Sequence, residues 1–487
     1  MYWEEYESDE NPYQDQLAIL RRIRERVNWE NFEERRDLLD RFDPVISDWK
    51  GRPQDLRGIL PKQEMDWLLS ESTRHSYDDK HDRGKRFIDF VARSGYEDVP
   101  ELDEDGKPIL RLATALHRLP RIHEPGTQIV LDLFRVYSRY DANYTDSATG
   151  TTHFHVACRF GQESVVRGFL ELGQDPDCRL PTTTTTSRCA VDPPLHLALW
   201  RKHERVSELL LRAGADPNLS NEEGWTPLHV ISNRDDDDEL AKLFFEINDG
   251  LKRTVQVDAR DKEGRTPLQW AVTSLLPDVV DVLLDRGADL ASFVFPTENH
   301  FHERFEEWRY REWDYFQLRV ASGLLACAER LERRGYELSR GDVLTIVKLC
   351  NVHGVFGRPA YFREFWYNDE NLTSTLEEIK MRDDDPSSPS LHDLVRSRGK
   401  EQEKLLACMD YFKFARVERR LDSGSQTASC NLHLCEIMMR GFCRRWALDA
   451  FVQLTRYRLP ILCCDTIVER LMNQDLCNIF LAATQVV

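Results

Sequence analysis

The chain has 487 residues, of which 41% are hydrophobic and 31% charged, and its formal net charge at pH 7 is −19. This composition predicts a globular protein, because it supplies enough apolar surface for a large core and is not that of a disordered chain. The negative charge argues against nucleic acid or an anionic membrane as a partner, since either would favour a concentrated basic face.

The amino terminus and the cysteines indicate a protein of the cytosol or nucleus. Residues 1–7 have no positive segment followed by an apolar core, so we expect no signal peptide. No apolar run approaches the length of a transmembrane helix. The 12 cysteines are scattered along the chain and form no compact disulfide framework, which favours reduced thiols.

The N-terminal part has helical periodicity, with apolar residues such as Leu17, Leu20 and Ile23 on one face. This predicts a helical region over residues 1–86, with a loop in the polar stretch 77–85. The apolar run 87–91, which closes at Gly95, is typical of the second helix of a degenerate repeat. Such a repeat would cap an array that follows it.

One sequence pattern occurs twice near the middle of the chain. It reads Glu-Gly-Trp-Thr-Pro-Leu-His at residues 223–229 and Glu-Gly-Arg-Thr-Pro-Leu-Gln at residues 263–269. In each copy Gly favours a positive-φ turn, Thr caps the helix that follows, and Pro suits its first position. Gly287 then provides a left-handed stop for a second helix. Each copy therefore predicts two short helices and a turn.

These words resemble the ankyrin repeat, whose unit is roughly 33 residues long. The histidine position of the pattern recurs at His117, His155, His196 and His229, and as Gln269, which indicates five repeats within residues 87–295. In ankyrin-like units this histidine bonds backbone groups and ties adjacent repeats together, so we assign it no catalytic role. The resemblance implies an all-α fold with short β-hairpin turns, in which an ankyrin-repeat solenoid is flanked by N-terminal and C-terminal helical regions.

The same resemblance implies that a target protein binds in the ankyrin groove, through positions that follow the histidine or flank the turn glycine. The predicted contact residues are Arg159, Phe160, Trp200, Arg201, Glu222, Trp225 and Arg265. The threonine run 182–186 and the aspartate run 235–238 are interpreted as solvated loops, with partner contact as the alternative for both.

Helical periodicity continues after the repeats. We expect a divergent helical continuation over residues 296–385 and a C-terminal helical region over residues 386–456. Helices are predicted within residues 405–414 and 432–454, and exposed linkers at residues 382–389 and 422–429.

Nothing in the sequence indicates an enzyme. There is no P-loop, dinucleotide fingerprint or nucleophile elbow, so we expect no catalytic residues and no cofactor. Cys430, His433, Cys435 and Cys443 are suitable zinc ligands by type, but no Cys-x-x-Cys pair is present and the leucines between them indicate a helix. We therefore predict no metal site.

Residues 457–487 contain a Leu-Pro step that opens a helix, a predicted break at residues 473–475 and a second helix after it. This segment resembles the PRANC module, the truncated F-box-like segment that ends ankyrin proteins of poxviruses and of some insects, notably parasitoid wasps. In the viral members the module is associated with binding the linker subunit of cullin-based ubiquitin ligases. The resemblance implies docking residues at Leu459, Pro460, Ile467, Leu471 and Leu476.

Two functions follow from these resemblances. The favoured one is an adaptor that captures a target protein on its ankyrin face and recruits a cullin-based ubiquitin ligase through its C-terminal segment. The alternative is an ankyrin scaffold, or a stoichiometric inhibitor of a signalling protein, in which the last helices only cap the solenoid.

Overall fold

The fold is known from a computed structural model, and it is mostly helical. The structure describes residues 12–49, 53, 56–78, 82–121, 126–178, 192–236, 239–308, 315–357, 374, 376–382, 388–396, 406–416 and 424–485. Within these ranges strand pairing is limited to isolated bridges, such as Leu102 with Pro108 and Thr145 with Thr152. The predicted all-α class with short hairpin turns is confirmed. The threonine run 182–186 lies outside the described residues.

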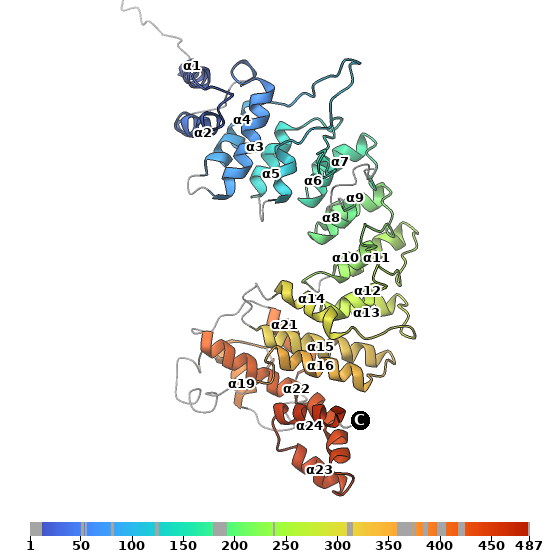
Figure 1. The fold of residues 1–487 in the computed structure, drawn as a ribbon. Helices are drawn as coiled ribbons and strands as arrows, with labels where there is room; N and C mark the ends of the chain where they lie inside the picture. Colours follow the sequence, from blue (N-terminus) through green and yellow to red (C-terminus); the bar gives the residue numbers. More distant parts are fainter. Residues whose placement is uncertain are drawn as a thin grey trace, which may run out of the picture. The chain divides into compact units, whose positions relative to one another are not determined.

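Most of the helices that follow one another along the chain are short, whereas α22 has 31 residues (Figure 1). Their bounds are α1 Pro12–Glu25, α2 Phe32–Ser47, η1 Leu56–Gly58, α3 Lys62–Asp78, α4 Arg83–Ser94, η2 Ala115–Arg121, α5 Thr127–Val136, α6 His153–Arg159, α7 Glu163–Glu171, α8 Pro194–Trp200, α9 Glu204–Ala213, α10 Pro227–Ser232, α11 Leu240–Gly250, α12 Pro267–Thr273, α13 Pro277–Asp285, α14 Glu298–Trp308, α15 Phe316–Arg333, α16 Arg340–Val352, α19 Leu391–Arg396, α21 Cys408–Arg416, α22 Gly424–Leu454, α23 Ile461–Val468 and α24 Asn473–Gln485.

The chain divides into two compact units. Unit 1 comprises Met1–Val230 and Leu243–Val255, and unit 2 comprises Ile231–Lys242 and Gln256–Val487. Unit 1 holds the N-terminal helices and most of the repeated words, whereas unit 2 holds the last repeated word and the C-terminal helices. The finer borders at residues 86, 295, 385 and 456 stay predictions.

In unit 1 the loop predicted over residues 77–85 is wrong at residues 77–78 and 83–85, because α3 extends to Asp78 and α4 begins at Arg83. The charged residues at the start of α4 pair with residues of α2. Arg83 forms an ion pair with Asp40, and Arg86 forms one with Asp43, so both hold α4 against α2. The end of α4 agrees with the prediction, since its C-cap Gly95 has a φ of 77°.

The repeats are paired short helices, seen in the green part of the chain as α6 with α7 and α8 with α9 (Figure 1). The predicted turn glycines all have positive φ, at 81° for Gly224, 79° for Gly264 and 87° for Gly287. Thr266 caps α12 by accepting a hydrogen bond from the Gln269 N–H at 3.3 Å, and Pro267 opens the helix as predicted.

The first repeat departs from this pattern, since its inner segment is the 3-10 helix η2 in place of an α-helix. Pro120 lies inside η2 and has no N–H to donate to a carbonyl one helical turn earlier. Proline at this position therefore disfavours a regular α-helix.

In unit 2, α22 packs on α15, α23 and α24. The linker predicted at residues 422–429 is wrong from Gly424 onward, because α22 begins there and extends to Leu454. Adding residues to an existing helix costs little, since each new residue brings a backbone hydrogen bond. The predicted break at residues 473–475 is also wrong, because these residues form the first turn of α24. The Asp475 carboxylate accepts a hydrogen bond from the Met472 N–H at 3.2 Å and so supports that turn.

The aspartate run is not simply solvated, because Asp235 is held by groups from α14 and α15 within unit 2. Its carboxylate accepts hydrogen bonds from Arg304 at 2.6 Å and from the Trp308 indole at 2.9 Å. Its backbone carbonyl accepts one from Arg319 at 2.5 Å. Burial lowers the pKa of Arg319 to about 10, and the Arg304 side chain is also buried, whereas the Asp235 side chain is partly exposed. The sequence could not show that buried arginines lie around this loop.

Within the described ranges, no helix combines the length and the apolar character that a bilayer crossing requires. No group of three or more His, Cys, Asp or Glu side chains in these ranges is arranged to hold a metal ion.

Candidate functional site

Two of the repeated histidines, His117 and His196, bond to the turn of the next repeat, as predicted. Nδ1 of His117 accepts a hydrogen bond from the Thr114 N–H at 3.0 Å, and its Nε2 lies 3.2 Å from the Tyr144 carbonyl oxygen. His196 reaches the Trp225 carbonyl oxygen at 2.8 Å in the same way. Gln269 replaces the histidine with matching groups, since its Oε1 accepts from the Thr266 N–H and its Nε2 donates to the Val294 carbonyl, both at 3.0 Å.

Burial keeps His117 and His155 neutral. It lowers the pKa of His117 to about 4 and that of His155 to about 4, despite weaker opposing effects from neighbouring groups. At neutral pH these two side chains are therefore uncharged hydrogen-bonding groups.

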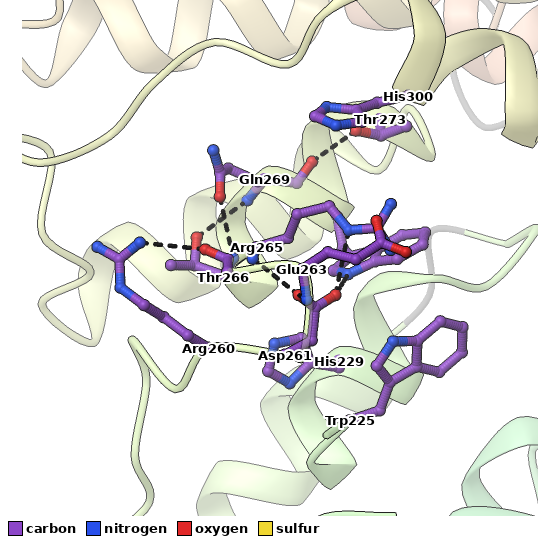
Figure 2. Close-up of polar contacts among 12 residues, drawn as sticks. Trp225, His229, Arg260, Asp261, Glu263, Arg265, Thr266, Gln269, Thr273 and His300 are labelled. Carbon is purple, nitrogen blue, oxygen red and sulfur yellow. Dashed lines mark hydrogen bonds and ion pairs between the residues drawn. The ribbon is translucent and has the colours of Figure 1, made fainter. Parts of the chain in front are cut away.

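The turn before α12 holds Arg265 in a fixed place (Figure 2). Arg265 pairs with Asp261 at 3.1 Å and with Glu263 at 2.8 Å, and its guanidinium lies 4.0 Å from the centre of the Trp270 ring. Burial alone would raise the pKa of Asp261, but hydrogen bonds from Trp270 and Arg265 and the charge of Arg265 outweigh it and hold that pKa below its usual range. Arg265 is thus mainly a framework residue, contrary to the expectation that it is free of such duties.

The turn before α10 is built in the same manner around Asn221 in unit 1. The Asn221 side chain accepts hydrogen bonds from the Glu223 N–H at 3.0 Å and from the Trp225 N–H at 2.9 Å. Glu222 is exposed at the tip of this turn, and the Trp225 side chain is half-buried. Glu222 is accessible to a partner, whereas Trp225 is partly committed to packing.

The other predicted contact residues of unit 1 lie at the ends of α6 and α8. Trp200 is 45% exposed and Arg201 is exposed, whereas Arg159 and Phe160 are half-buried. Burial, followed by the charge of Arg201, lowers the pKa of Arg159, which indicates that the two guanidiniums are near each other. Trp200 and Arg201 are therefore the more accessible contacts at this place.

Sequence reasoning missed an elongated hairpin ahead of the first repeat. Asp103 accepts hydrogen bonds from the Asp105 N–H at 3.0 Å and the Lys107 N–H at 2.8 Å, and Gly106 has a φ of 73°, as in the later turns. However, Gly106 precedes Thr114 by eight residues, whereas Gly264 precedes Thr266 by two. The extra length leaves Leu102, Ile109 and Leu112 exposed. The word Asp-Glu-Asp-Gly at residues 103–106 was the available signal.

A second exposed surface lies in unit 2, on the turn after α22 and on α23. Tyr457 is 74% exposed, Ile461 59% and Leu462 78%. Leu459 and Ile467 are also exposed, and we call these five residues the C-terminal apolar surface. Large exposed apolar side chains this close together in sequence are candidates for an interaction site.

The helix that carries this surface is anchored from one side. Cys464 and Val468 lie four residues apart on α23 and are buried. Arg440 of α22 donates hydrogen bonds to the backbone carbonyls that end α23, among them that of Glu469 at 2.6 Å. Arg444 of α22 pairs with Asp465 at 3.2 Å. The remaining faces of α23 are left to solvent.

The predicted docking residues fall into two groups. Leu459, Pro460 and Ile467 are exposed, and Leu471 is half-buried. Leu476 is fully buried in α24, so in this structure a partner cannot reach it. Pro460 is the N-cap of α23, which fits the predicted Leu-Pro helix start. Sequence reasoning missed Tyr457, Ile461 and Leu462, since helical spacing alone does not reveal which face of a short helix is covered.

Comparison with known proteins supports the repeats. The chain matches the family described as "Ankyrin repeats (3 copies)" over residues 122–221 and 195–293. It is 27% identical over 168 residues to the E3 ubiquitin-protein ligase KEG of Arabidopsis thaliana, covering 32% of this chain and 9% of that protein. It is 36% identical over 98 residues to the neurogenic locus notch homolog protein 4 of Homo sapiens, covering 20% of this chain and 5% of that protein.

A further relative is the probable 26S proteasome regulatory subunit p28 of Saccharomyces cerevisiae, with 30% identity over 149 residues that cover 30% of this chain and 59% of that protein. The chain thus spans less than two thirds of the length of each of these relatives.

Proposed function

We propose that this chain, whose central repeats are ankyrin repeats, is an adaptor that binds a target protein through the repeats and a cullin-ligase linker subunit through its C-terminal apolar surface. The repeats themselves indicate a protein–protein interaction scaffold. The ligase link is the finer part of the proposal.

The observation that carries the ligase link is the exposure of the C-terminal apolar surface. If α23 only capped the preceding helices, Ile461 and Leu462 would be covered, since an exposed apolar helix face gives up the hydrophobic stabilisation of a cap. Instead α23 is fixed through Cys464 and Val468 and offers its other faces outward. A partner can bind only what the chain leaves accessible.

For the target, the accessible positions support contacts at Trp200, Arg201 and Glu222. Tryptophan and arginine are the side chains that most often dominate binding energy at protein interfaces. Trp225, Arg159 and Phe160 contribute from half-buried positions in unit 1, and Arg265 shapes its own turn in unit 2.

Two of the relatives carry names from ubiquitin-dependent degradation, a ubiquitin ligase and a proteasome regulatory subunit. These names agree with the proposal, but they describe those proteins and not this chain. The accessibility of α23 is the stronger support because it belongs to this chain.

The experiment is a calorimetric titration of the purified cullin-ligase linker subunit into the full chain and into two variants. Leu462→Asp places a charge on the exposed surface, so we expect it to abolish linker binding while the free energy of unfolding changes by less than about 0.5 kcal/mol.

The matched control is Leu476→Asp, which buries a charge in the same segment and should cost several kcal/mol, on the order of 3–5, by denaturant unfolding. If the unchanged chain shows no heat of binding with the linker, the ligase link fails and only the interaction scaffold remains.

A further inference from the structure

The turn that joins α22 to α23 has an unusual backbone. Arg456 has a φ of 52° and Tyr457 a φ of 58°, and among the described residues they are the only adjacent non-glycine pair in the left-handed region. This conformation is costly for side chains that are not Gly, Asn or Asp. The turn closes α22, since the Tyr457 N–H donates to the Val452 carbonyl at 3.1 Å and the Arg456 N–H to the Gln453 carbonyl at 2.9 Å.

The Tyr457 side chain contributes little packing to this turn. It is 74% exposed, so it neither fills a core nor covers a neighbour to any large extent. Glycine would make the same backbone bonds without the strain. A strained residue with a large, exposed aromatic side chain is the arrangement expected where the side chain serves a partner.

Three exposed arginines and the exposed Glu469 lie beside the C-terminal apolar surface in sequence, although the whole chain has a net charge of −19. Arg456, Arg458 and Arg470 flank the surface in sequence, and all three are exposed. Within the described part of the chain none of them forms an ion pair, whereas Arg444 and Arg445 of α22 are paired with Asp465 and Glu332. The three arginines are therefore available to carboxylates of another protein.

We propose that Tyr457 is an anchor residue for the partner of the C-terminal apolar surface, and that Arg456, Arg458 and Arg470 bind carboxylates at the rim of the groove that receives it. The partner surface is then an apolar groove with an acidic rim. This inference rests on the proposed function, in which the occupant is the cullin-ligase linker subunit, and it adds the turn and its charges to the α23 residues.

Charge complementarity makes the inference testable through salt. Cations that contact carboxylates at an interface raise the association rate and make it fall with ionic strength. An apolar contact made by Tyr457 does not respond to salt in this way. Salt should therefore weaken the contribution of the arginines to linker binding and leave the contribution of Tyr457 unchanged.

The experiment measures linker binding to the full chain by calorimetry at about 50 mM and about 300 mM salt, together with the thermal midpoint of each variant. Tyr457→Gly should raise the midpoint, because it relieves backbone strain, and weaken linker binding about tenfold or more. Lys252→Gly is the matched control, since Lys252 has a φ of 55° and is exposed in unit 1. It should raise the midpoint and leave linker binding unchanged.

The role of the charges is tested with a double variant that combines Arg456→Glu and Arg458→Glu. This pair should weaken binding about tenfold at the lower salt and reduce the salt dependence of the affinity. The control with the same kind of charge change is Arg205→Glu on α9, which should leave linker binding unchanged.

The outcomes separate this inference from the function on which it rests. Suppose that the unchanged chain binds the linker, and that Tyr457→Gly and the arginine variants bind it as tightly. This result would overturn the inference and leave the ligase link in place. No linker binding by the unchanged chain would overturn the ligase link, and the inference would fall with it.

Discussion

The backbone at Gly264 has a φ of 79°, and a β-carbon built there would meet no atom within 4 Å. Space is therefore no obstacle to a side chain, and the cost of substitution is conformational. We predict that Gly264→Val lowers the free energy of unfolding by about 1–3 kcal/mol, measured by denaturant titration. Gly264→Asn should cost clearly less, because asparagine tolerates the left-handed region. Equal losses for both variants would mean that the turn is held by something other than φ.

His117 makes the stability of the repeats depend on pH. Its pKa is lowered by burial to about 4 in the folded chain, from an ordinary 6.5, so the unfolded chain takes up the proton more readily. The stability that neutral His117 contributes is complete above pH 6.5 and is lost as the pH falls towards 4. The loss amounts to about 3 kcal/mol, since each pKa unit is worth about 1.36 kcal/mol.

Gln269 shows how to remove this dependence without removing the hydrogen bonds. We predict that His117→Gln matches the parent within about 1 kcal/mol at pH 8 and loses less stability than the parent between pH 6.5 and 4. Asp66 has the opposite effect, because burial raises its pKa to about 6, but it is present in both proteins and cancels in the comparison. Parallel stability curves for the two proteins would contradict the assignment of the proton to His117.

At the scale of elements, the loop before α11 is held by arginines from distant helices. The Arg304 guanidinium is nearly buried against Asp235, whereas Asp236 is largely exposed beside Arg416. We predict that Asp235→Ala lowers the free energy of unfolding by about 3–5 kcal/mol, because it leaves buried positive charge without its partner. Asp236→Ala should cost less than about 1 kcal/mol. If denaturant titration gave similar losses of unfolding free energy for the two variants, burial would not determine how much each ion pair contributes to stability.

The elements that the sequence predicted best are those fixed by local bonds. The capping Thr266, the first-turn Pro267 and the positive-φ Gly264 act within a few residues of their own helix, so their roles follow from spacing alone. The elements it missed depend on distant contacts. Arg304 meets Asp235 across 69 residues of sequence, and no periodicity reports such a pairing.

The C-terminal segment divides in the same way. The Leu-Pro helix start at Pro460 was predictable, since proline suits the beginning of a helix. Which leucines face outward was not, because Leu462 and Leu476 have the same chemistry and differ only in what packs over them. The docking residues inferred from family resemblance therefore included buried Leu476 and omitted exposed Leu462.

At the scale of the whole molecule, the two proposed interactions are assigned to different compact units. The exposed target contacts Trp200, Arg201 and Glu222 belong to unit 1, and the C-terminal apolar surface belongs to unit 2. Each unit has its own buried core, so a change on one surface is expected to leave the other surface folded. This separation is what an adaptor needs, since it must hold one partner without giving up the other.

The most direct measurement is amide hydrogen exchange of the full chain with and without a saturating amount of the cullin-ligase linker subunit. We predict slower exchange in residues 455–472, which hold the turn and α23, with no change in the repeats from α6 to α13. Slower exchange in the repeats alone would mean that the linker is bound there as a target, and no change anywhere would mean that it is not bound. Either result would contradict an adaptor that recruits its ligase through α23.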